Sequence, residues 1–137
     1  MFQGEVAAVL AYTAAVARRM GLGASEMAAL EHLQAAGELT PGRLGEMLSM
    51  TSGAVTALVD RMEAAGYVER GPNPRDRRSS LLRPTAAGTA EGAKHLGPLA
   101  AEVQGIIGDL TEEERAAVGR FLGRVTGAIL RHTRGGE

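Results

Sequence analysis

The sequence predicts an α+β fold that is mainly α. Two observations lead to this prediction: apolar residues recur at helical spacing through most of the chain, and only two short segments alternate as strands do. The chain has 137 residues, enough for one domain or one subunit that buries roughly two thirds of its unfolded surface. Hydrophobic residues make up 45% and charged residues 23%, so we expect the chain to fold rather than remain disordered.

Two helices are predicted at the beginning of the chain. The apolar spacing indicates a first helix over residues 5–20, which Gly21 ends. We expect Ser25 to cap a second helix that runs to about Ala36, because serine is favoured just before a helix. The inward positions of the second helix are Met27, Leu30 and Leu33, and the apolar residues that lie mostly on one face of the first helix are Val6, Val9, Leu10, Val16 and Met20.

A helix-turn-helix is predicted next. Thr40 followed by Pro41 marks a helix start, because proline lacks an N–H group that the first helical residue does not need. The apolar period breaks after Leu48 for about three residues and then resumes in a helix that Gly66 ends. Two helices joined by so short a turn form a helix-turn-helix candidate. Their inner positions are Leu44, Met47, Leu48, Val55, Leu58, Val59 and Met62.

A short β-hairpin follows this pair of helices. Residues 67–70 and 80–83 alternate in polarity as strands do. Residues 71–74 are Gly-Pro-Asn-Pro, from which we expect no regular structure, and Pro84 is expected to end the second strand. A hairpin directly after a helix-turn-helix is the layout of a winged helix, here covering residues 25–88.

Two long helices are predicted after the hairpin. Thr85 is expected to cap a helix over residues 86–108, and Thr111 begins a capping box for a last helix. Their apolar stripes are too long to be covered within one small lobe. We therefore expect residues 1–24 and 86–137 to form dimerisation helices that pack against a second copy, which makes the protein a homodimer. The stripes consist of Leu96, Leu99, Val103, Ile106, Ile107, Val118, Phe121, Leu122, Val125 and Ile129.

The overall composition excludes several classes of function. The net charge of −1 gives the whole chain no attraction to nucleic acid or to a membrane surface. The absence of cysteine excludes disulfides, thiolate metal sites and thiol catalysis. No apolar run reaches 18 residues and the first residues do not resemble a signal peptide, so we expect a cytoplasmic protein without a membrane partner.

One segment departs from this charge balance. Residues 70–83 carry five arginines against a single acid, Asp76. Such a run is also compatible with a solvated surface hairpin. Here it follows a predicted helix-turn-helix, and arginines at a hairpin tip can lie over phosphates while one enters the narrow minor groove of DNA. The five are Arg70, Arg75, Arg77, Arg78 and Arg83.

The helix after the predicted turn has an outer face of small residues. Ser52, Gly53, Thr56 and Ala57 would let it approach base edges in a major groove about 12 Å wide. Both hydroxyls can contact phosphates or bases, and Arg61, one turn further on, can reach a phosphate or brace the hairpin. The alternative is an ordinary solvent-exposed helix face. The scarcity of long side chains predicts only modest direct reading of base sequence.

Four stretches between residues 39 and 88 carry a family resemblance. They are T-S-G-A-V-T-A-L-V-D-R-M-E-A-A-G from Thr51 to Gly66, the Y-V-E-R that follows, P-R-D-R-R from Pro74 to Arg78, and P-T-A-A-G from Pro84 to Gly88. In these stretches the chain resembles the MarR family of transcriptional regulators, which implies that the helix near Thr51 is a recognition helix. Pro84 departs from the family pattern, which commonly has leucine before the threonine, and it shortens the return strand.

The resemblance also implies roles for the residues of the hairpin. It implies that Arg78 enters the minor groove and that Asp76 supports the wing, with Arg61 as its expected partner. We expect the neighbouring Arg75 and Arg77 to bind mainly phosphates.

Other chemistry has little support in the sequence. His32, His95 and His132 have no helical metal-ligand spacing, so we expect no metal site and no cofactor. The three glutamates at 112–114 are explained by their place at a helix start, where acids stabilise the helix. No nucleophile elbow surrounds any serine, so we do not expect an enzyme.

The predicted function is dimeric, sequence-specific binding of double-stranded DNA that regulates transcription. We expect repression at a near-palindromic operator and release by a small aromatic or phenolic effector, with Tyr12 and His32 near its pocket. For Tyr12, the alternative is a role in the dimer interface. Two other functions stay open: a winged-helix module that binds a protein, and an architectural DNA binder without sequence preference. Salt-titrated binding to operator-like and random duplexes separates the three.

Overall fold

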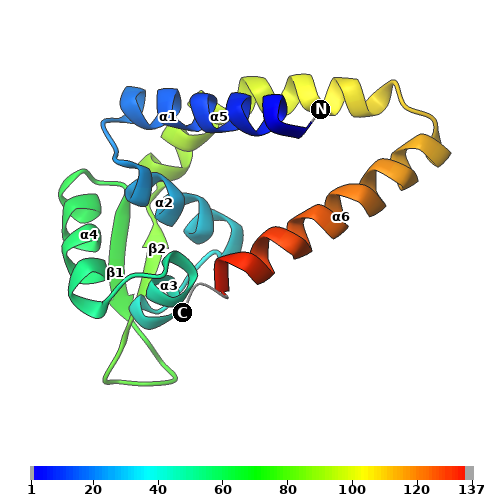
Figure 1. The fold of residues 1–137 in the computed structure, drawn as a ribbon. Helices are drawn as coiled ribbons and strands as arrows, with labels where there is room; N and C mark the ends of the chain where they lie inside the picture. Colours follow the sequence, from blue (N-terminus) through cyan, green and yellow to red (C-terminus); the bar gives the residue numbers. More distant parts are fainter. Residues whose placement is uncertain (1, 135–137) are drawn as a thin grey trace. The chain divides into compact units, whose positions relative to one another are not determined.

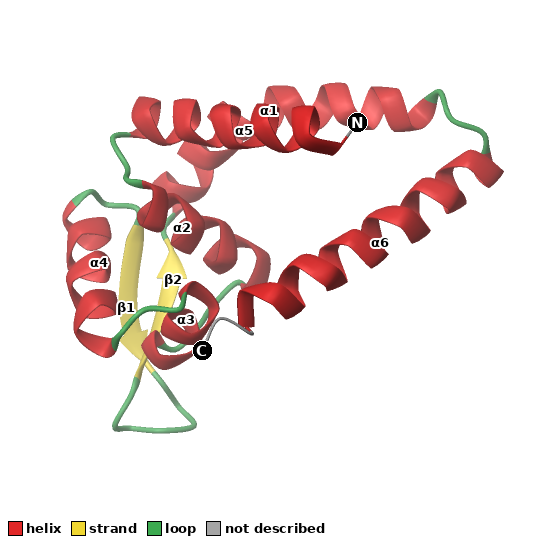
Figure 2. Cartoon of the chain, viewed as in Figure 1, coloured by secondary structure: helices red, strands yellow, loops and turns green. Residues whose placement is uncertain are grey.

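The computed structural model describes residues 2–134 of the chain. Helices predominate in this part, and the strands form one two-stranded hairpin (Figure 2). This confirms the predicted mainly helical α+β fold with a winged helix-turn-helix. In chain order (Figure 1), the elements are α1 (Phe2–Met20), α2 (Ala24–Ala36), α3 (Pro41–Leu48), α4 (Ser52–Ala64), β1 (Val68–Pro72), β2 (Ser80–Pro84), α5 (Ala86–Gly108) and α6 (Glu112–Arg134).

The chain divides into two compact units, Met1–Leu96 and Gly97–Glu137. The hydrophobic core of the first unit draws on every helix from α1 to α4 and on both strands, so the end of α1 packs into the same core as the helix-turn-helix. The predicted inner faces of α2 and α4 are confirmed, because all seven of their apolar positions are buried. The core side chains are Val16, Ala17, Met20, Met27, Ala29, Leu30, Leu33, Leu44, Val55, Leu58, Val59, Met62, Val68 and Leu82.

The start of α2 differs from the prediction. Ser25 lies inside the helix, and Gly23 is the residue that precedes it. The backbone N–H group of Gly23 donates a hydrogen bond to the Glu26 carboxylate. The carboxylate in the first turn thus accepts a hydrogen bond from a backbone N–H group near the helix start, and its negative charge interacts favourably with the positive end of the helix dipole.

The helix-turn-helix forms as predicted. The Thr40 hydroxyl accepts a hydrogen bond from the backbone N–H group at the third position of α3, and the Thr51 hydroxyl does the same for α4. Gly45 lies where the two helices meet. A Cβ atom built on Gly45 would be 3.1 Å from Val55 Cγ2 and 3.2 Å from the Met50 carbonyl oxygen, so a larger residue would push the helices apart.

The hairpin is longer than predicted. β1 and β2 pair antiparallel from Val68↔Pro84 to Pro72↔Ser80. Gly71 and Pro72 are therefore strand residues, although we expected no regular structure there. Pro72 is tolerated because it is the last residue of its strand, where the missing N–H group costs at most one hydrogen bond at the end of the ladder.

The beginning of α5 is fixed against the end of α4. Gly66 adopts a φ of +80°, the left-handed conformation that glycine provides after a helix. The Thr85 hydroxyl accepts from the Gly88 N–H group at 3.0 Å and donates to the Gly66 carbonyl oxygen at 2.6 Å. A Cβ atom on Gly88 would lie 2.3 Å from the Tyr67 carbonyl oxygen, so only glycine fits there.

The second unit holds the end of α5 and all of α6. The predicted capping box is present: Thr111 accepts from the Glu114 N–H group at 3.2 Å, and the Glu114 carboxylate accepts from the Thr111 N–H group at 2.8 Å. The hydrogen bond from the Thr111 backbone N–H group, and after it the Thr111 side chain, hold the pKa of Glu114 below its ordinary value. Among residues 112–132, whose exposure is described, none is buried. None of the described helices has the length and apolar content to span a bilayer.

Candidate nucleic-acid interface

The outer face of α4 is exposed and nearly free of bulk. Ser52, Gly53, Thr56 and Ala57 all face solvent, and a Cβ atom on Gly53 would have no atom within 4 Å. The Thr56 hydroxyl donates to the Ser52 carbonyl oxygen at 3.0 Å. Its proton is thus engaged within the helix, which leaves the oxygen lone pairs and the methyl group on the outside. Another molecule can approach the α4 backbone closely along this face.

The turn between β1 and β2 is held by two similar hydrogen bonds. Asn73 Oδ1 accepts from the Arg75 N–H group at 3.0 Å, and Asp76 Oδ1 accepts from the Arg78 N–H group at 2.9 Å. Each is an Asx turn, in which a short side chain binds the backbone two residues further on. Asn73 is buried although it lies in a loop. The turn extends beyond α3 and α4, away from the body of this unit (Figure 1).

The five arginines of residues 70–83 fall into two groups. Arg70 is held by Asp60, with Nη2 and Oδ1 at 2.7 Å, and by Glu63. Arg83 Nη2 lies 2.8 Å from Glu38 Oε2. These two guanidinium groups are therefore neutralised by carboxylates from outside the hairpin.

The other three arginines are located in the turn itself. Arg75, Arg77 and Arg78 are exposed, and none of their guanidinium groups has an ion-pair partner among the residues that the structure describes. The positive charge that is available to a ligand is thus concentrated at the tip of the hairpin.

Arg61 does not contact Asp76, contrary to the expectation for the wing. Its Nε atom donates to Glu26 Oε1 at 2.8 Å, and Nη2 lies 2.8 Å from the same oxygen. Only 12% of the Glu26 side chain is exposed, against 59% for Arg61. Glu26 thus binds both the start of α2, through Gly23, and the outer side of α4. Asp76 instead stabilises the hairpin turn from within it, through the Arg78 backbone.

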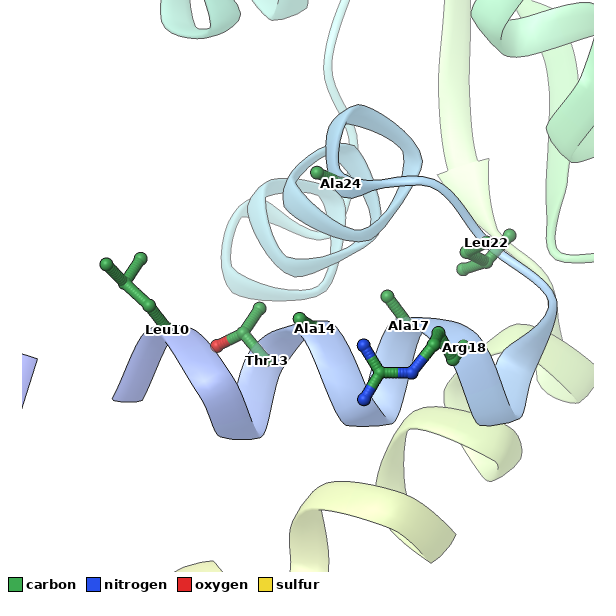
Figure 3. Close-up of a pocket in the computed structure, with 7 residues that line it drawn as sticks. All are labelled: Leu10, Thr13, Ala14, Ala17, Arg18, Leu22 and Ala24. Atoms are coloured by element: carbon green, nitrogen blue, oxygen red, sulfur yellow. The ribbon is translucent and has the colours of Figure 1, made fainter. Parts of the chain in front are cut away.

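Tyr12 and His32, the residues expected near an effector pocket, are both half-buried. The Tyr12 hydroxyl donates to the His95 carbonyl oxygen at 2.7 Å and so ties α1 to α5. A cavity of about 430 Å³ lies beside α1 (Figure 3), but neither Tyr12 nor His32 lines it. Within residues 2–134 no three His, Asp or Glu side chains are grouped to hold a metal ion.

The comparisons with known proteins agree on one family. The MarR family model matches residues 20–79. The HTH-type transcriptional regulator YcgE of Bacillus subtilis (strain 168) is 36% identical over 110 residues, which are 80% of this chain and 71% of that protein. The chain belongs to the MarR family. Members of this family are DNA-binding transcription regulators and not enzymes, which confirms the expected class.

Two solved structures of relatives contain DNA. An Escherichia coli MarR mutant complexed with operator DNA matches with a TM-score of 0.60 and 29% identity, over 83% of this chain and 82% of that one. Streptococcus pneumoniae FabT in complex with DNA matches with a TM-score of 0.64 and 29% identity, over 80% of this chain and 77% of that one. The chain is thus a MarR-family transcriptional regulator whose structural relatives include DNA complexes.

Sequence reasoning missed three parts of this site. Asn73 was not singled out, although Asn and Asp each stand two residues before an arginine, a spacing typical of Asx turns. Asp60 could have been found as well, because it follows Thr56 by four residues and so shares its helix face. The role of Glu26 had no local signal, since its partner Arg61 is 35 residues away.

Proposed function

We propose that this MarR-family regulator binds double-stranded DNA through the outer face of α4 and the turn of the hairpin. In this arrangement Ser52, Gly53, Thr56 and Ala57 enter the major groove, where small side chains permit close approach. Arg78 enters the minor groove, and Arg75 and Arg77 bind phosphates. The observation that carries the proposal is the set of three exposed arginines without acidic partners at the tip of the hairpin.

The first experiment is selection of bound duplexes from a random pool, followed by affinity measurements at fixed salt. Replacing Arg78 with alanine should weaken binding of the selected duplex by roughly 1 to 3 kcal/mol per half-site, because a minor-groove contact depends on the local DNA sequence. The Arg77→Ala variant should bind selected and random duplexes more weakly by the same factor. Unchanged affinity of Arg78→Ala, with wild-type melting, would refute the placement of the hairpin.

The regulator is proposed to act as a homodimer. A helix of 23 residues with no buried position gains little from packing within its own chain, and α6 is such a helix over the residues whose exposure is described. Apolar side chains remain exposed on α1, α5 and α6, including Phe121 with 55% of its surface in solvent. A second copy can cover them. Other exposed apolar side chains on these helices include Val6, Val9, Leu99, Val103, Ile106, Val118, Leu122 and Leu130.

Sedimentation equilibrium at micromolar concentration tests the dimer. A folded, stable monomer would end this part of the proposal. A two-fold dimer places two α4 helices on one duplex, so the selected site should be a near-palindrome with half-sites about 34 Å apart, one turn of DNA.

Regulation is proposed to be repression by occupancy of a promoter, in the cytoplasm where the DNA lies. A small aromatic or phenolic effector would release the operator if it favoured a dimer whose two α4 helices no longer match the DNA. A bias of about 1 to 3 kcal/mol lowers affinity 5- to 150-fold. A reporter gene behind the selected duplex tests repression directly: expression that does not fall when the regulator is present excludes it.

A further inference from the structure

Arg70 connects the hairpin to α4, which lies beside β1 (Figure 1). Its guanidinium group binds two carboxylates of that helix: Nη2 is 2.7 Å from Asp60 Oδ1, and Nη1 binds Glu63. Asp60 and Glu63 are three residues apart and are therefore neighbours on the helix surface. A planar guanidinium group that binds a different carboxylate with each terminal nitrogen is restricted in its orientation. The contact between β1 and α4 is thus directional.

The place of this contact along the hairpin is also informative. The base of the hairpin is held by the core, in which Val68 and Leu82 are buried. Arg70 lies two residues beyond Val68, and the strands continue for two more residue pairs before the turn that carries Arg78. A two-stranded hairpin has little stability of its own. The side chain of Arg70 therefore binds α4 at a point where it limits rotation of the hairpin about its base.

A small rotation would be enough to displace the turn from a DNA groove. A strand rises about 3.3 Å per residue, so rotation by about 15° around Val68 would move Pro72 by roughly 3 Å. The minor groove of DNA is only about 6 Å wide. A fixed angle between the hairpin and α4 is therefore required if α4 and Arg78 are to occupy adjacent grooves of one duplex at the same time.

We propose that Arg70 is a positioning residue for DNA recognition, which fixes the angle between the hairpin and α4 and so places Arg78 in the minor groove. The fixed angle is a property of the free protein. The placement of Arg78 rests on the proposed function, because it is read out as DNA affinity. The competing explanation is purely electrostatic: Arg70 would only offset the negative charge of Asp60 and Glu63 close to the phosphates.

The angle is tested in the free protein. The chain has no cysteine, so spin labels can be attached at Ala57→Cys on α4 and Arg77→Cys in the turn. Dilution with unlabelled protein keeps the two labels of each measured pair within one protomer. The distribution of distances between the labels should be broader in Arg70→Gln than in wild type. It should be unchanged in Arg43→Gln, which removes the same charge from an exposed ion pair within α3. Equal widths in all three proteins would overturn the positioning role.

The placement of Arg78 is tested by a double-mutant cycle on the selected duplex. In the wild-type background, Arg78→Ala should weaken duplex binding by roughly 5- to 150-fold per half-site. In the Arg70→Gln background this factor should be at least about threefold smaller, because Arg78 no longer reaches the groove reliably. In the Arg43→Gln background the factor should be the same as in wild type.

Breaking the contact from the side of α4 separates position from charge. The double variant Asp60→Asn, Glu63→Gln removes two negative charges, whereas Arg70→Gln removes a positive one. If Arg70 acts by position, both variants should reduce the contribution of Arg78. Exposed ion pairs contribute little to stability, so both variants should melt as wild type does. If Arg70→Gln does not fold, the carboxylate variant provides the same test.

The electrostatic explanation predicts a different result. Arg70→Gln would weaken binding of selected and random duplexes by the same factor, the carboxylate variant would strengthen it, and Arg78→Ala would have the same effect in every background. That result would overturn the proposal. Failure to select any duplex would overturn the proposed function together with the placement of Arg78, whereas the label distances would still decide whether Arg70 fixes the angle of the hairpin.

Discussion

The two groups of hairpin arginines should differ in how they respond to salt. An arginine that binds a phosphate releases counterions, and each such contact contributes about −0.9 to the slope of log affinity against log salt. Removing Arg77 from both protomers of the proposed dimer should therefore reduce the slope by about 1.8. As the salt concentration rises from 50 to 200 mM, the ratio of wild-type affinity to Arg77→Ala affinity should therefore fall about tenfold.

The matched control removes an arginine that the structure shows to be neutralised. The double variant Glu38→Ala, Arg83→Ala eliminates one ion pair and leaves the net charge unchanged. Its slope should stay within about 0.5 of wild type, because this pair releases few counterions on binding. The assay is fluorescence anisotropy with the selected duplex at five salt concentrations. Equal slopes for Arg77→Ala and the double variant would refute the division of the arginines into free and neutralised groups.

Three further predictions concern the fold and the face of α4. Gly53→Gln should leave the free protein as stable as wild type or about 0.5 kcal/mol more stable, yet weaken DNA binding by about 1 to 3 kcal/mol, because a long side chain would hinder close approach of α4 to the duplex. Unchanged anisotropy curves would contradict the placement of α4 in the major groove. Gly88→Ala should lower the free energy of unfolding by about 1 to 3 kcal/mol, because its Cβ atom meets the Tyr67 carbonyl oxygen, and urea denaturation of Gly53→Ala provides the control. Thr111 lowers the pKa of Glu114, so the charged Glu114 carboxylate should stabilise the folded protein fully above the ordinary glutamate pKa, and this stabilisation should be lost as the pH falls through the lowered pKa. Urea denaturation should show that the difference in free energy of unfolding between wild type and Glu114→Gln shrinks in acid. A difference that stays constant with pH would contradict this prediction.

Local signals in the sequence were sufficient for most of the helix boundaries. Thr40, Thr51, Thr85 and Thr111 all precede helices and all bind backbone N–H groups there, because this capping chemistry acts within three residues. Ser25 failed as a cap because a competing local interaction, between Glu26 and the residue before the helix, occupies the same place. Capping patterns alone do not decide between such competitors.

The exposed surface and the available charge of the candidate site could be predicted only in part. The exposed face of α4 follows from helical periodicity, since its buried positions fix the outer ones. The number of available arginines does not follow from the segment's composition, because the partners of Arg70 and Arg83 come from α4 and from Glu38, 45 residues before Arg83. Ion pairing across such separations depends on the tertiary structure, which residue spacing does not reveal.

The tandem Asx turns mean that the hairpin tip is ordered before it meets a ligand. Fixing the backbone of one residue costs roughly 1 to 2 kcal/mol of conformational free energy, and for Arg75 and Arg78 this cost is already included in folding. Only their side-chain rotamers remain to be selected on contact. The hairpin can therefore test successive positions along a duplex in one fixed shape, so that encounters are limited by diffusion and charge rather than by folding of the loop.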